Sequence, residues 1–178
     1  MQFGLVGSEM CIRDRVNQSF PDKPILFTEG TVEAFSTDKY QYWPNAERYG
    51  FSMIRDFNRG TVGWTDWNLL LDQTGGPNHV SNFCFAPIHG DTSTGELIYT
   101  PTYYYIGHFS KFVGPDSVRI STSVSRNVVL ATSFLNPDGT MATIVMNKSN
   151  DSINYSFFLN DRQVDLTIPP RAMQTLVY

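Results

Sequence analysis

The spacing of hydrophobic positions along the chain changes near Gly114-Pro115. Before these two residues the apolar runs are either continuous or repeat at helical spacing. After them, short apolar segments return roughly every ten residues, as in a protein built from antiparallel strands. The pattern therefore predicts an α/β region followed by an all-β region, divided at residue 114.

The α/β region begins with a continuous apolar run at residues 24–28. Such a run is typical of a parallel strand that is buried on both faces. Residues 61–67 predict a second strand. Between the two strands a helix is predicted over residues 47–58, ending at Gly60, because aromatic and apolar side chains recur there at four-residue spacing: Tyr49, Met53 and Phe57.

A second helix is predicted from Pro101 to residue 113, with Thr100 as its N-cap and proline at the first helical position. Gly114 and Pro115 end it. The order strand, helix, strand, long loop, helix is the rhythm of a (β/α)8 TIM barrel. The region thus predicts the last two strand-helix units of such a barrel.

The all-β region predicts six short strands rich in β-branched and aromatic residues. A turn is expected at residues 136–139, where Pro137 holds its backbone φ and Gly139 is free to adopt a positive φ. The region predicts an antiparallel β-sandwich domain. The expected strands are residues 118–123, 127–134, 141–147, 153–159, 163–168 and 173–178.

Composition and charge narrow the possible functions. The 178 residues are 41% hydrophobic and 17% charged, which is typical of a protein with a packed core. The formal net charge of -4 and the lack of a basic cluster do not favour nucleic acid or an anionic membrane as a partner. No apolar run approaches the roughly 18 residues of a membrane span. The sequence indicates no protein partner and leaves the localisation open.

The first residues differ in character from the rest of the chain. Residues 10–15, MCIRDR, match the translation of a transposon end that is used to prepare sequencing libraries. We therefore interpret residues 1–15 as a non-native leader, followed by a barrel portion over 16–114 and a sandwich over 115–178. Cys84 then remains as the one cysteine, and we interpret it as a small buried hydrophobe rather than a reactive thiol.

The motif PILFTEG sets a carboxylate, Glu29, at the end of the first predicted strand. In parallel barrels the reactive groups emerge at the carboxyl ends of the strands, beside apolar walls yet open to a ligand. A carboxylate there can act as a nucleophile or as an acid-base group. A helix cap or an ordinary surface charge is the alternative for a single glutamate.

Two tryptophans, Trp64 and Trp67, lie three residues apart in GWTDWN near the end of the second strand. Indole rings stack on the apolar faces of sugars, so this motif indicates a glycan site, although Trp64 fits a core position equally well. The next motif is the glycine and proline turn GGPNHVSNF, residues 75–83, which brings backbone close to a ligand. Its polar side chains are Asn78, His79 and Asn82.

The histidines indicate neither a metal site nor a catalytic triad. His79 and His108 are interpreted as structural or surface groups, because no serine or cysteine with a matching acid is spaced beside them. No HExxH or similar ligand spacing occurs. The sequence predicts no metal and no cofactor.

Five motifs in register resemble glycoside hydrolase family 30, closest to its glucosylceramidase and β-1,6-glucanase branch. They are PILFTEG, VGWTDWNLLLDQTGGPN, SNFCFAPI, GELIYTPTYYYIGHFSKFV and the VRI that follows. The resemblance runs from about Pro24 to Tyr178. It implies a retaining β-glycosidase on a (β/α)8 barrel with an attached β-sandwich.

The resemblance also implies roles for single residues. Glu29, in the TE motif of the family, would be the nucleophile. Trp67 and Asn82 match residues that contact the sugar, and Trp64 is added as a substrate-binding candidate. His79 stands where the lysosomal glucosylceramidases carry tryptophan, which weakens the case for a ceramide preference.

The acid/base glutamate of the family lies in an Asn-Glu-Pro stretch, and this sequence has none. We therefore interpret the chain as a C-terminal fragment, inactive by itself and prone to aggregate, of an enzyme acting on a β-glucoside, β-glucan or glycolipid carbohydrate. Two alternatives stay open. The chain could be a non-catalytic glycan-binding module, or an inactive remnant.

Overall fold

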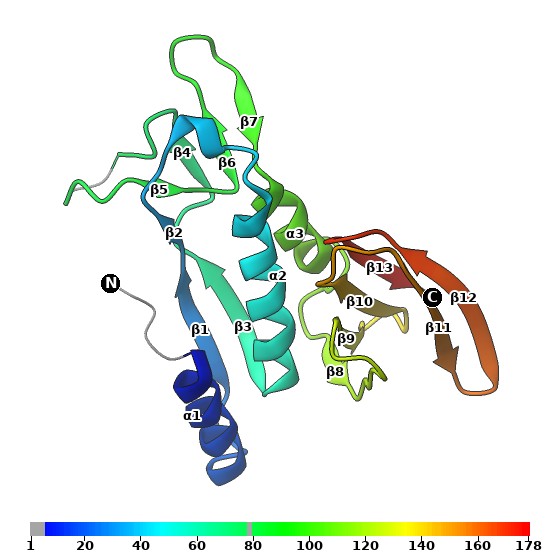
Figure 1. Cartoon of the computed structure of the whole chain (residues 1–178). Helices are drawn as coiled ribbons and strands as arrows, with labels where there is room; N and C mark the ends of the chain where they lie inside the picture. The colour runs from blue at the N-terminus through cyan, green and yellow to red at the C-terminus, as the bar shows by residue number, and fades with distance from the viewer. Residues whose placement is uncertain (1–5, 78–79) are drawn as a thin grey trace. The chain divides into compact units, whose positions relative to one another are not determined.

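The computed structural model describes residues 6–77 and 80–178, with side chains described from residue 12 onwards. The chain divides into two compact units. One holds the residues up to Tyr42 together with Arg55–Thr100, and the other holds Trp43–Ile54 together with Pro101–Tyr178. Figure 1 shows the helices and strands of both units.

The first unit contains two parallel strands, β1 (Ile25–Gly30) and β3 (Thr61–Asp66), which lie side by side in Figure 1. Helix α2 (Trp43–Asn58) connects them along the chain, which confirms the predicted strand-helix-strand order. The prediction that the first strand is buried on both faces is wrong for this chain. Leu26 and Val62 are 61% and 63% exposed, because the described residues leave one face of the pair uncovered.

Helix α1 (Val6–Ser19) covers part of the segment that is predicted to be a non-native leader. Arg13 forms an ion pair with Asp56, and its guanidinium lies 5.3 Å from the ring centroid of Phe27. Asp14 pairs with Arg59 at 3.0 Å. These contacts do not test where the residues come from, so the interpretation of residues 1–15 as a non-native leader stays a prediction.

Short elements occur in two connecting segments: β2 and η1 lie between β1 and α2, and β4 to β7 lie between β3 and α3, where the sequence predicts a long loop. These strands are too short to show a hydrophobic period, which is why the pattern missed them. Strand β2 pairs antiparallel with β5, β4 pairs parallel with β6, and β6 pairs antiparallel with β7. The bounds are β2 Val32–Glu33, 3-10 helix η1 Thr37–Lys39, β4 Leu70–Asp72, β5 Cys84–Phe85, β6 Ile88–Gly90 and β7 Leu97–Tyr99.

Helix α2 starts at Trp43, four residues earlier than predicted, and Pro44 is its second residue. The fixed φ of proline suits the start of a helix. Its end agrees with the prediction, because the chain leaves the helix at Gly60 with a φ of 89°. Ala46, Tyr49 and Met53 are buried apolar side chains spaced three to four residues apart, and with the neighbouring Ile54 they form one face of the helix.

Helix α3 (Pro101–Ser110) ends three residues before the predicted stop. Thr100 precedes it as expected, but its hydroxyl donates to the carbonyl oxygens of Ala86 and Pro87, at 3.2 and 3.1 Å. The predicted N-cap therefore fastens the chain to the preceding segment through its side chain. None of the described helices is long and apolar enough to cross a membrane.

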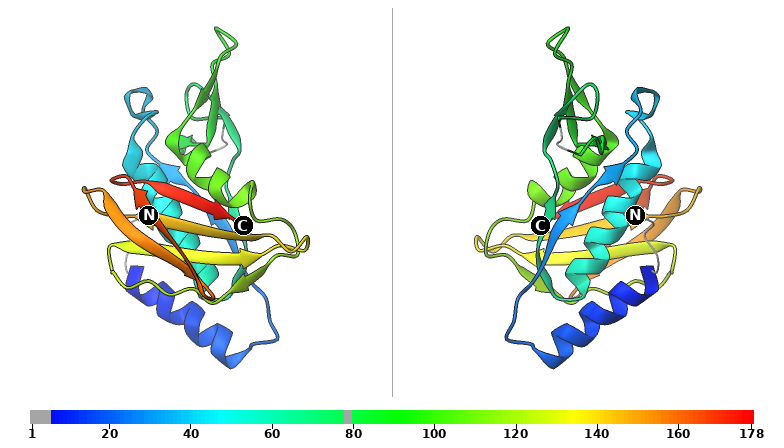
Figure 2. Two further views of the ribbon diagram at one scale, coloured as in Figure 1. Left: turned by 90° about the vertical axis from the view of Figure 1, so that its right-hand side faces the viewer. Right: turned by 90° about the vertical axis from the view of Figure 1, so that its left-hand side faces the viewer.

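The second unit contains a four-stranded antiparallel sheet in the order β13-β10-β9-β8 and a separate hairpin, β11-β12. Figure 2 shows the hairpin in orange and the sheet in green, yellow and red. This arrangement confirms the predicted antiparallel sandwich. The bounds are β8 Val118–Ile120, β9 Val129–Leu135, β10 Met141–Asn147, β11 Ile153–Leu159, β12 Arg162–Ile168 and β13 Met173–Val177.

The bounds of β10 and β11 agree with the prediction at both ends. Turn chemistry explains the agreement for the β9-β10 hairpin. Gly139 has a φ of 86°, and its amide donates to the carbonyl oxygen of Asn136 at 3.0 Å. Strand β8 is shorter than predicted, since only residues 118–120 pair with β9.

The sandwich core joins the sheet to the hairpin. Val129, Ala131 and Val145 come from the sheet, and Ile153 and Ile168 come from the hairpin. Each large apolar side chain buried here contributes about 1.5–3 kcal/mol relative to an exposed one. These contacts hold the two sheets face to face.

Arg171 connects the start of α2 and helix α3 to the sandwich within the second unit. Its carbonyl oxygen accepts hydrogen bonds from the Trp43 indole and the Tyr105 hydroxyl, both at 2.7 Å. Its guanidinium pairs with the buried Glu47 and donates to the carbonyl oxygen of Lys148 at 2.9 Å. Burial, with Glu47 as the second cause, raises the pKa of Tyr105 to about 12, so its hydroxyl stays a donor.

Candidate active site

Glu29 lies inside strand β1, one residue before its end, and its side chain is exposed. The prediction placed it just after the strand. The β1-β3 register shifts here, because Phe27 pairs with Trp64 while Gly30 pairs with Asp66. The extra residue on β1 leaves Thr28 and Glu29 exposed in succession. Such irregularities redirect side chains and are common beside active sites.

Trp67 immediately follows β3 at the same end of the parallel pair. Its amide donates to the carbonyl oxygen of Gly30 at 2.7 Å, which fixes it beside the residue that follows Glu29. Its indole is 49% exposed. An exposed flat ring and an exposed carboxylate thus lie at the same end of the parallel pair, and a sugar-binding site needs groups of both kinds.

Trp64 packs against the protein and not toward solvent. Its ring stacks on Phe27 with a centroid distance of 4.7 Å and an interplanar angle of 11°. Its indole N–H donates to the Asp56 carboxylate at 3.2 Å. Because both a ring face and the polar edge have protein partners, these contacts indicate that Trp64 supports β1. Its predicted contact with sugar stays a prediction.

Asn82 lies in the loop between β4 and β5 and is exposed. Its side-chain amide donates to the Glu33 carboxylate at 3.1 Å, and its carbonyl oxygen accepts from the Cys84 thiol at 3.3 Å. Strand pairing adds a backbone connection, since Glu33 is opposite Cys84 in the β2-β5 pair. The structure thus joins the Asn82 loop to the segment that follows Glu29.

The start of the same loop is held by Asp72. One carboxylate oxygen accepts from the Thr74 amide, the Thr74 hydroxyl and the Gly76 amide, at 2.8, 2.6 and 3.1 Å. The hydrogen bond from the Thr74 side chain is the main cause that lowers the pKa of Asp72. Gly75 has a φ of 80°, and a Cβ there would lie 2.7 Å from the carbonyl oxygen of Cys84. Glycine is therefore required at this turn.

The other sequence-predicted residues have simpler outcomes. Asn78 and His79 lie outside the described residues. His108 is half-buried in α3 with its Nδ1 2.7 Å from the Thr175 hydroxyl, which agrees with a structural role. Cys84 is buried with a free thiol, and burial raises its pKa, as expected for an unreactive cysteine.

Sequence reasoning missed two residues of this region, Glu33 and His89. Glu33 belongs to no recognisable motif, because its hydrogen-bond partner Asn82 is 49 residues away in the sequence. His89 stands in the apolar segment API-H-G, where a lone histidine gives no recognisable motif. Within the described part of the chain, no three His, Cys, Asp or Glu side chains gather as metal ligands.

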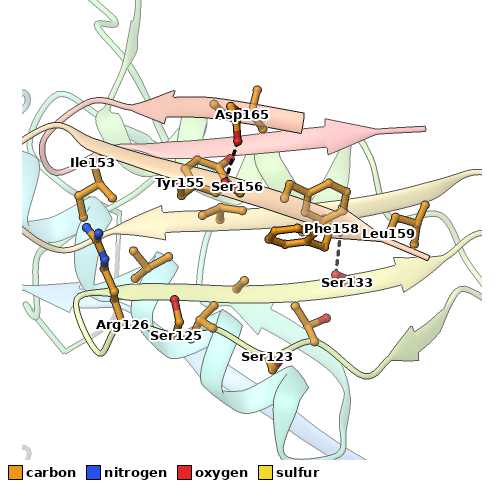
Figure 3. A pocket seen from close by; sticks show the side chains of 18 of the residues that line it. Ser123, Ser125, Arg126, Ser133, Ile153, Tyr155, Ser156, Phe158, Leu159 and Asp165 are labelled. Atoms are coloured by element: carbon orange, nitrogen blue, oxygen red, sulfur yellow. Dashed lines mark hydrogen bonds between the residues drawn. The ribbon is translucent and has the colours of Figure 1, made fainter. Parts of the chain in front are cut away.

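A hollow lies elsewhere, in the sandwich, where residues of β9, β10 and the β11-β12 hairpin line it. Its volume is about 940 Å³. Figure 3 shows hydroxyl groups and aromatic rings along its walls, including Ser133, Tyr155 and Phe158. Asp165 is the one carboxylate among its lining residues, and it accepts from Ser156 at 2.7 Å. Asp165 belongs to none of the motifs that the sequence analysis singled out, whereas Glu29 lies in PILFTEG, so we place the candidate site at Glu29.

Comparison with known proteins identifies the family of the chain. The glycosyl hydrolase family 30 TIM-barrel domain matches residues 8–113, and the family 30 beta sandwich domain matches residues 116–176. The chain therefore belongs to glycosyl hydrolase family 30, as a portion of the TIM barrel followed by the β-sandwich. The predicted family and fold class are confirmed.

Individual relatives support the assignment. Putative glucosylceramidase 4 of Caenorhabditis elegans is 34% identical over 171 residues, 91% of this chain and 33% of the relative. SrfJ from Salmonella typhimurium has a TM-score of 0.90 at 34% identity, covering 95% of this chain and 38% of that one. The endo-beta1,6-glucanase BT3312 has a TM-score of 0.78 at 26% identity, covering 93% and 38%. The chain thus spans about a third of the length of the curated relative.

Proposed function

We propose that this chain supplies the nucleophile and part of the sugar subsite of a retaining O-glycoside hydrolase that acts on β-glucosidic bonds. The observation that carries the proposal is the exposed Glu29 at the bulged end of β1, with the exposed Trp67 fixed beside it. Membership of family 30 supports the same reaction class.

In the proposed reaction a Glu29 carboxylate oxygen attacks the anomeric carbon. The bond from that carbon to the leaving oxygen breaks, and a second carboxyl group gives its proton to the leaving oxygen. Water then loses a proton to that second group and attacks the glycosyl ester, which releases the sugar and restores the Glu29 carboxylate. The two inversions retain the configuration.

Trp67 would stack on the apolar face of the sugar that reacts, and Asn82 would hydrogen-bond to its hydroxyls. Asn82 already donates to Glu33, so the loop presents an amide whose orientation is set by a carboxylate. Trp64 would act indirectly, because its ring stacks on Phe27 and so supports β1.

The second carboxyl group would come from a part of the barrel outside this sequence, because no Asn-Glu-Pro stretch occurs in it. A retaining enzyme needs the two carboxyl groups about 5–5.5 Å apart. We therefore expect the 178-residue chain by itself to be inactive and a version extended to the length of its relatives to be active.

The names of the relatives suggest two kinds of substrate. One is a putative glucosylceramidase, which points to a glycolipid, and one structure is an endo-beta1,6-glucanase, which points to a glucan. Both substrates present a β-glucosyl unit to the nucleophile. The proposal therefore commits to the β-glucosidic bond and names glycolipid and β-glucan as the two substrates to compare.

The test uses the extended protein, its Glu29→Gln variant and an aryl β-glucoside. Loss of the nucleophile should lower turnover by several orders of magnitude. A 2-fluoro-β-glucoside should also leave a stable glycosyl ester on the peptide that contains Glu29. Glu96→Gln is the matched control, because Glu96 is exposed in the turn between β6 and β7. Near-parental turnover of Glu29→Gln would sink the proposal.

A second candidate function is glycan binding without hydrolysis, and the 49% exposure of the Trp67 indole favours it. In that case Glu29→Gln would keep its affinity for β-glucan while no form of the protein hydrolyses it. Isothermal titration with a soluble β-1,6-glucan separates the two functions.

A further inference from the structure

The buried histidine on β6, His89, takes part in none of the steps above. It is fully buried. Its Nδ1 lies 2.9 Å from the carbonyl oxygen of Asp72, and its Nε2 lies 3.0 Å from the amide nitrogen of Ala86. Asp72 is the last residue of β4, before the loop that carries Asn82, and Ala86 directly follows β5, after that loop. One side chain therefore bonds to the chain on both sides of the loop.

The two partners determine the tautomer of His89. A carbonyl oxygen only accepts hydrogen bonds, so Nδ1 must carry the proton that it shares with Asp72. A backbone amide only donates, so Nε2 must offer its lone pair to Ala86. The imidazole is thus neutral with both nitrogens in use. A second proton would bring an N–H group against the N–H of Ala86 and break that bond.

The surroundings of the ring favour the same neutral form. Phe35, Tyr40 and Phe85 surround it, with ring centroids 4.9, 5.0 and 6.3 Å from that of His89. Burial among them is the main cause that lowers the pKa of His89. The Asp72 carboxylate, facing from β4, acts in the opposite direction. The titratable hydroxyl of Tyr40, facing from the segment after η1, donates to the carbonyl oxygen of Gln73 at 3.2 Å.

A continuous set of hydrogen bonds leads from His89 to Asn82. The carbonyl oxygen of Asp72 also accepts from the Gly75 amide at 3.1 Å, and the carbonyl oxygen of Gly75 accepts from the Cys84 amide at 3.0 Å. The Cys84 thiol then donates to the carbonyl oxygen of Asn82. The hydrogen bonds within the loop therefore begin at the Asp72 carbonyl oxygen that His89 also contacts.

We propose that His89 is a positioning residue, which fixes the loop between β4 and β5 and so holds Asn82 beside the strand that follows Glu29. The sugar-binding role of Asn82 rests on the proposed function. His89 touches neither the substrate nor Glu29, and it acts only through the loop.

Three substitutions separate the two hydrogen bonds of His89. His89→Asn keeps a donor near the Nδ1 position for Asp72, and His89→Gln keeps an acceptor near the Nε2 position for Ala86. His89→Leu removes both while remaining buried and apolar. His108→Leu is the control. It removes another histidine, which is half-buried and whose described hydrogen-bond partner, Thr175, lies in β13 and not in the loop.

The experiment measures two properties of the extended protein. Hydrogen exchange of the peptide covering residues 73–86 should become about tenfold faster in His89→Leu, because loss of a buried hydrogen bond typically changes an equilibrium by about that factor. The increase should be smaller in the Asn and Gln variants, which each keep one of the two bonds. KM for an aryl β-glucoside should rise about tenfold with kcat nearly unchanged, because Asn82 binds substrate and transition state alike. His108→Leu should leave both properties unchanged.

Each contrary result has a distinct meaning. Unchanged exchange in the 73–86 peptide overturns the claim that His89 holds the loop. Faster exchange with an unchanged KM overturns its positioning role and leaves a structural histidine. A wild-type protein without activity overturns the proposed function alone, and the exchange rates still decide whether His89 fixes the loop. Should His89→Leu fail to fold, the Asn and Gln variants decide the same questions.

Discussion

The backbone amide of Trp67 donates a hydrogen bond to the carbonyl oxygen of Gly30, with an N to O distance of 2.7 Å. This bond extends the β1-β3 pairing one residue beyond β3. It sets the exposed indole beside the residue that follows Glu29. The position of the stacking ring relative to the proposed nucleophile therefore depends on backbone geometry, which a side-chain substitution elsewhere can disturb.

Gly30 is the position where such a disturbance is easiest to predict. A Cβ there would overlap the Trp64 ring, with Cζ2 at 2.9 Å. We expect Gly30→Ala to reduce the free energy of unfolding by about 1–3 kcal/mol, as overpacking does, and to lower kcat/KM in the extended protein. Chemical denaturation and kinetics on an aryl β-glucoside measure the two effects.

Gly107 offers the matched control for that substitution. It lies in α3 with no atom within 4 Å of an added Cβ. Gly107→Ala should raise the free energy of unfolding by about 0.5–1 kcal/mol, because alanine loses less backbone entropy in a helix. Equal destabilisation by both substitutions would contradict the close contact between Gly30 and Trp64.

The two tryptophans should respond differently to substitution. Trp67→Ala should raise KM at least tenfold with little change in stability, because the ring is half exposed and its link to β1 is made by the backbone. Trp64→Phe should cost about 1 kcal/mol of stability through the lost bond to Asp56, with a smaller effect on KM. Thermal unfolding and KM, measured side by side, check the contrast; the reverse pattern would assign Trp64 to the sugar.

Arg171 should be a sensitive position of the second unit. Arg171→Ala leaves the buried Glu47 without its ion-pair partner, and the Arg171 side chain is 43% exposed, so we expect a loss of about 2 kcal/mol. Arg162→Ala, on the exposed hairpin, should stay within about 0.5 kcal/mol of the parent. Urea denaturation measures both. Restoring stability by adding Glu47→Gln to Arg171→Ala would confirm the cause.

Stability should fall when the solution is acidified below pH 6.5, the ordinary pKa of histidine. The pKa values of His89 and His108 are both lowered by burial, so the unfolded chain binds protons in a range where the folded chain does not. Linkage then makes the free energy of unfolding decrease as the pH falls from 6.5 toward the folded pKa values, and leaves it constant above 6.5.

Substitution of each histidine shows how much it contributes to the slope of the free energy of unfolding against pH. Each histidine contributes at most about 1.4 kcal/mol per pH unit, the free energy equivalent of one proton. Urea denaturation at a series of pH values should show a smaller slope in His89→Leu and in His108→Leu than in the parent. A parent stability that is constant between pH 7 and pH 5 would contradict buried neutral histidines.

The sequence predicted most of the regular elements because their signals are local. Segments rich in β-branched and aromatic residues sufficed for β10 and β11, whose bounds agree with the prediction at both ends, and the turn at Asn136–Gly139 marked the start of β10. The run Ile25-Leu26-Phe27 sufficed for a parallel strand, and the TE motif with its resemblance sufficed for Glu29 as the candidate. These features depend on residues within a few positions of one another.

The starting points of elements and the short strands were less predictable. Helix α2 begins at Trp43, where Arg171 accepts the indole hydrogen bond from across the second unit. Strands β2 and β5 are two residues long and form only because the loop returns to pair Glu33 with Cys84. Contacts between distant positions leave no period in the sequence.

By itself, the sequence determined the family, the succession of a barrel portion and a sandwich, and the acid proposed as the nucleophile, since each is carried by residues adjacent in the chain. Only the tertiary structure decided that Trp64 supports β1, that Asn82 meets Glu33, and that His89 bonds to the chain on both sides of the loop. The reason is physical: a hydrogen bond or a ring contact is specified by separation in space, and the chain brings residues such as Asn82 and Glu33 together only after it folds.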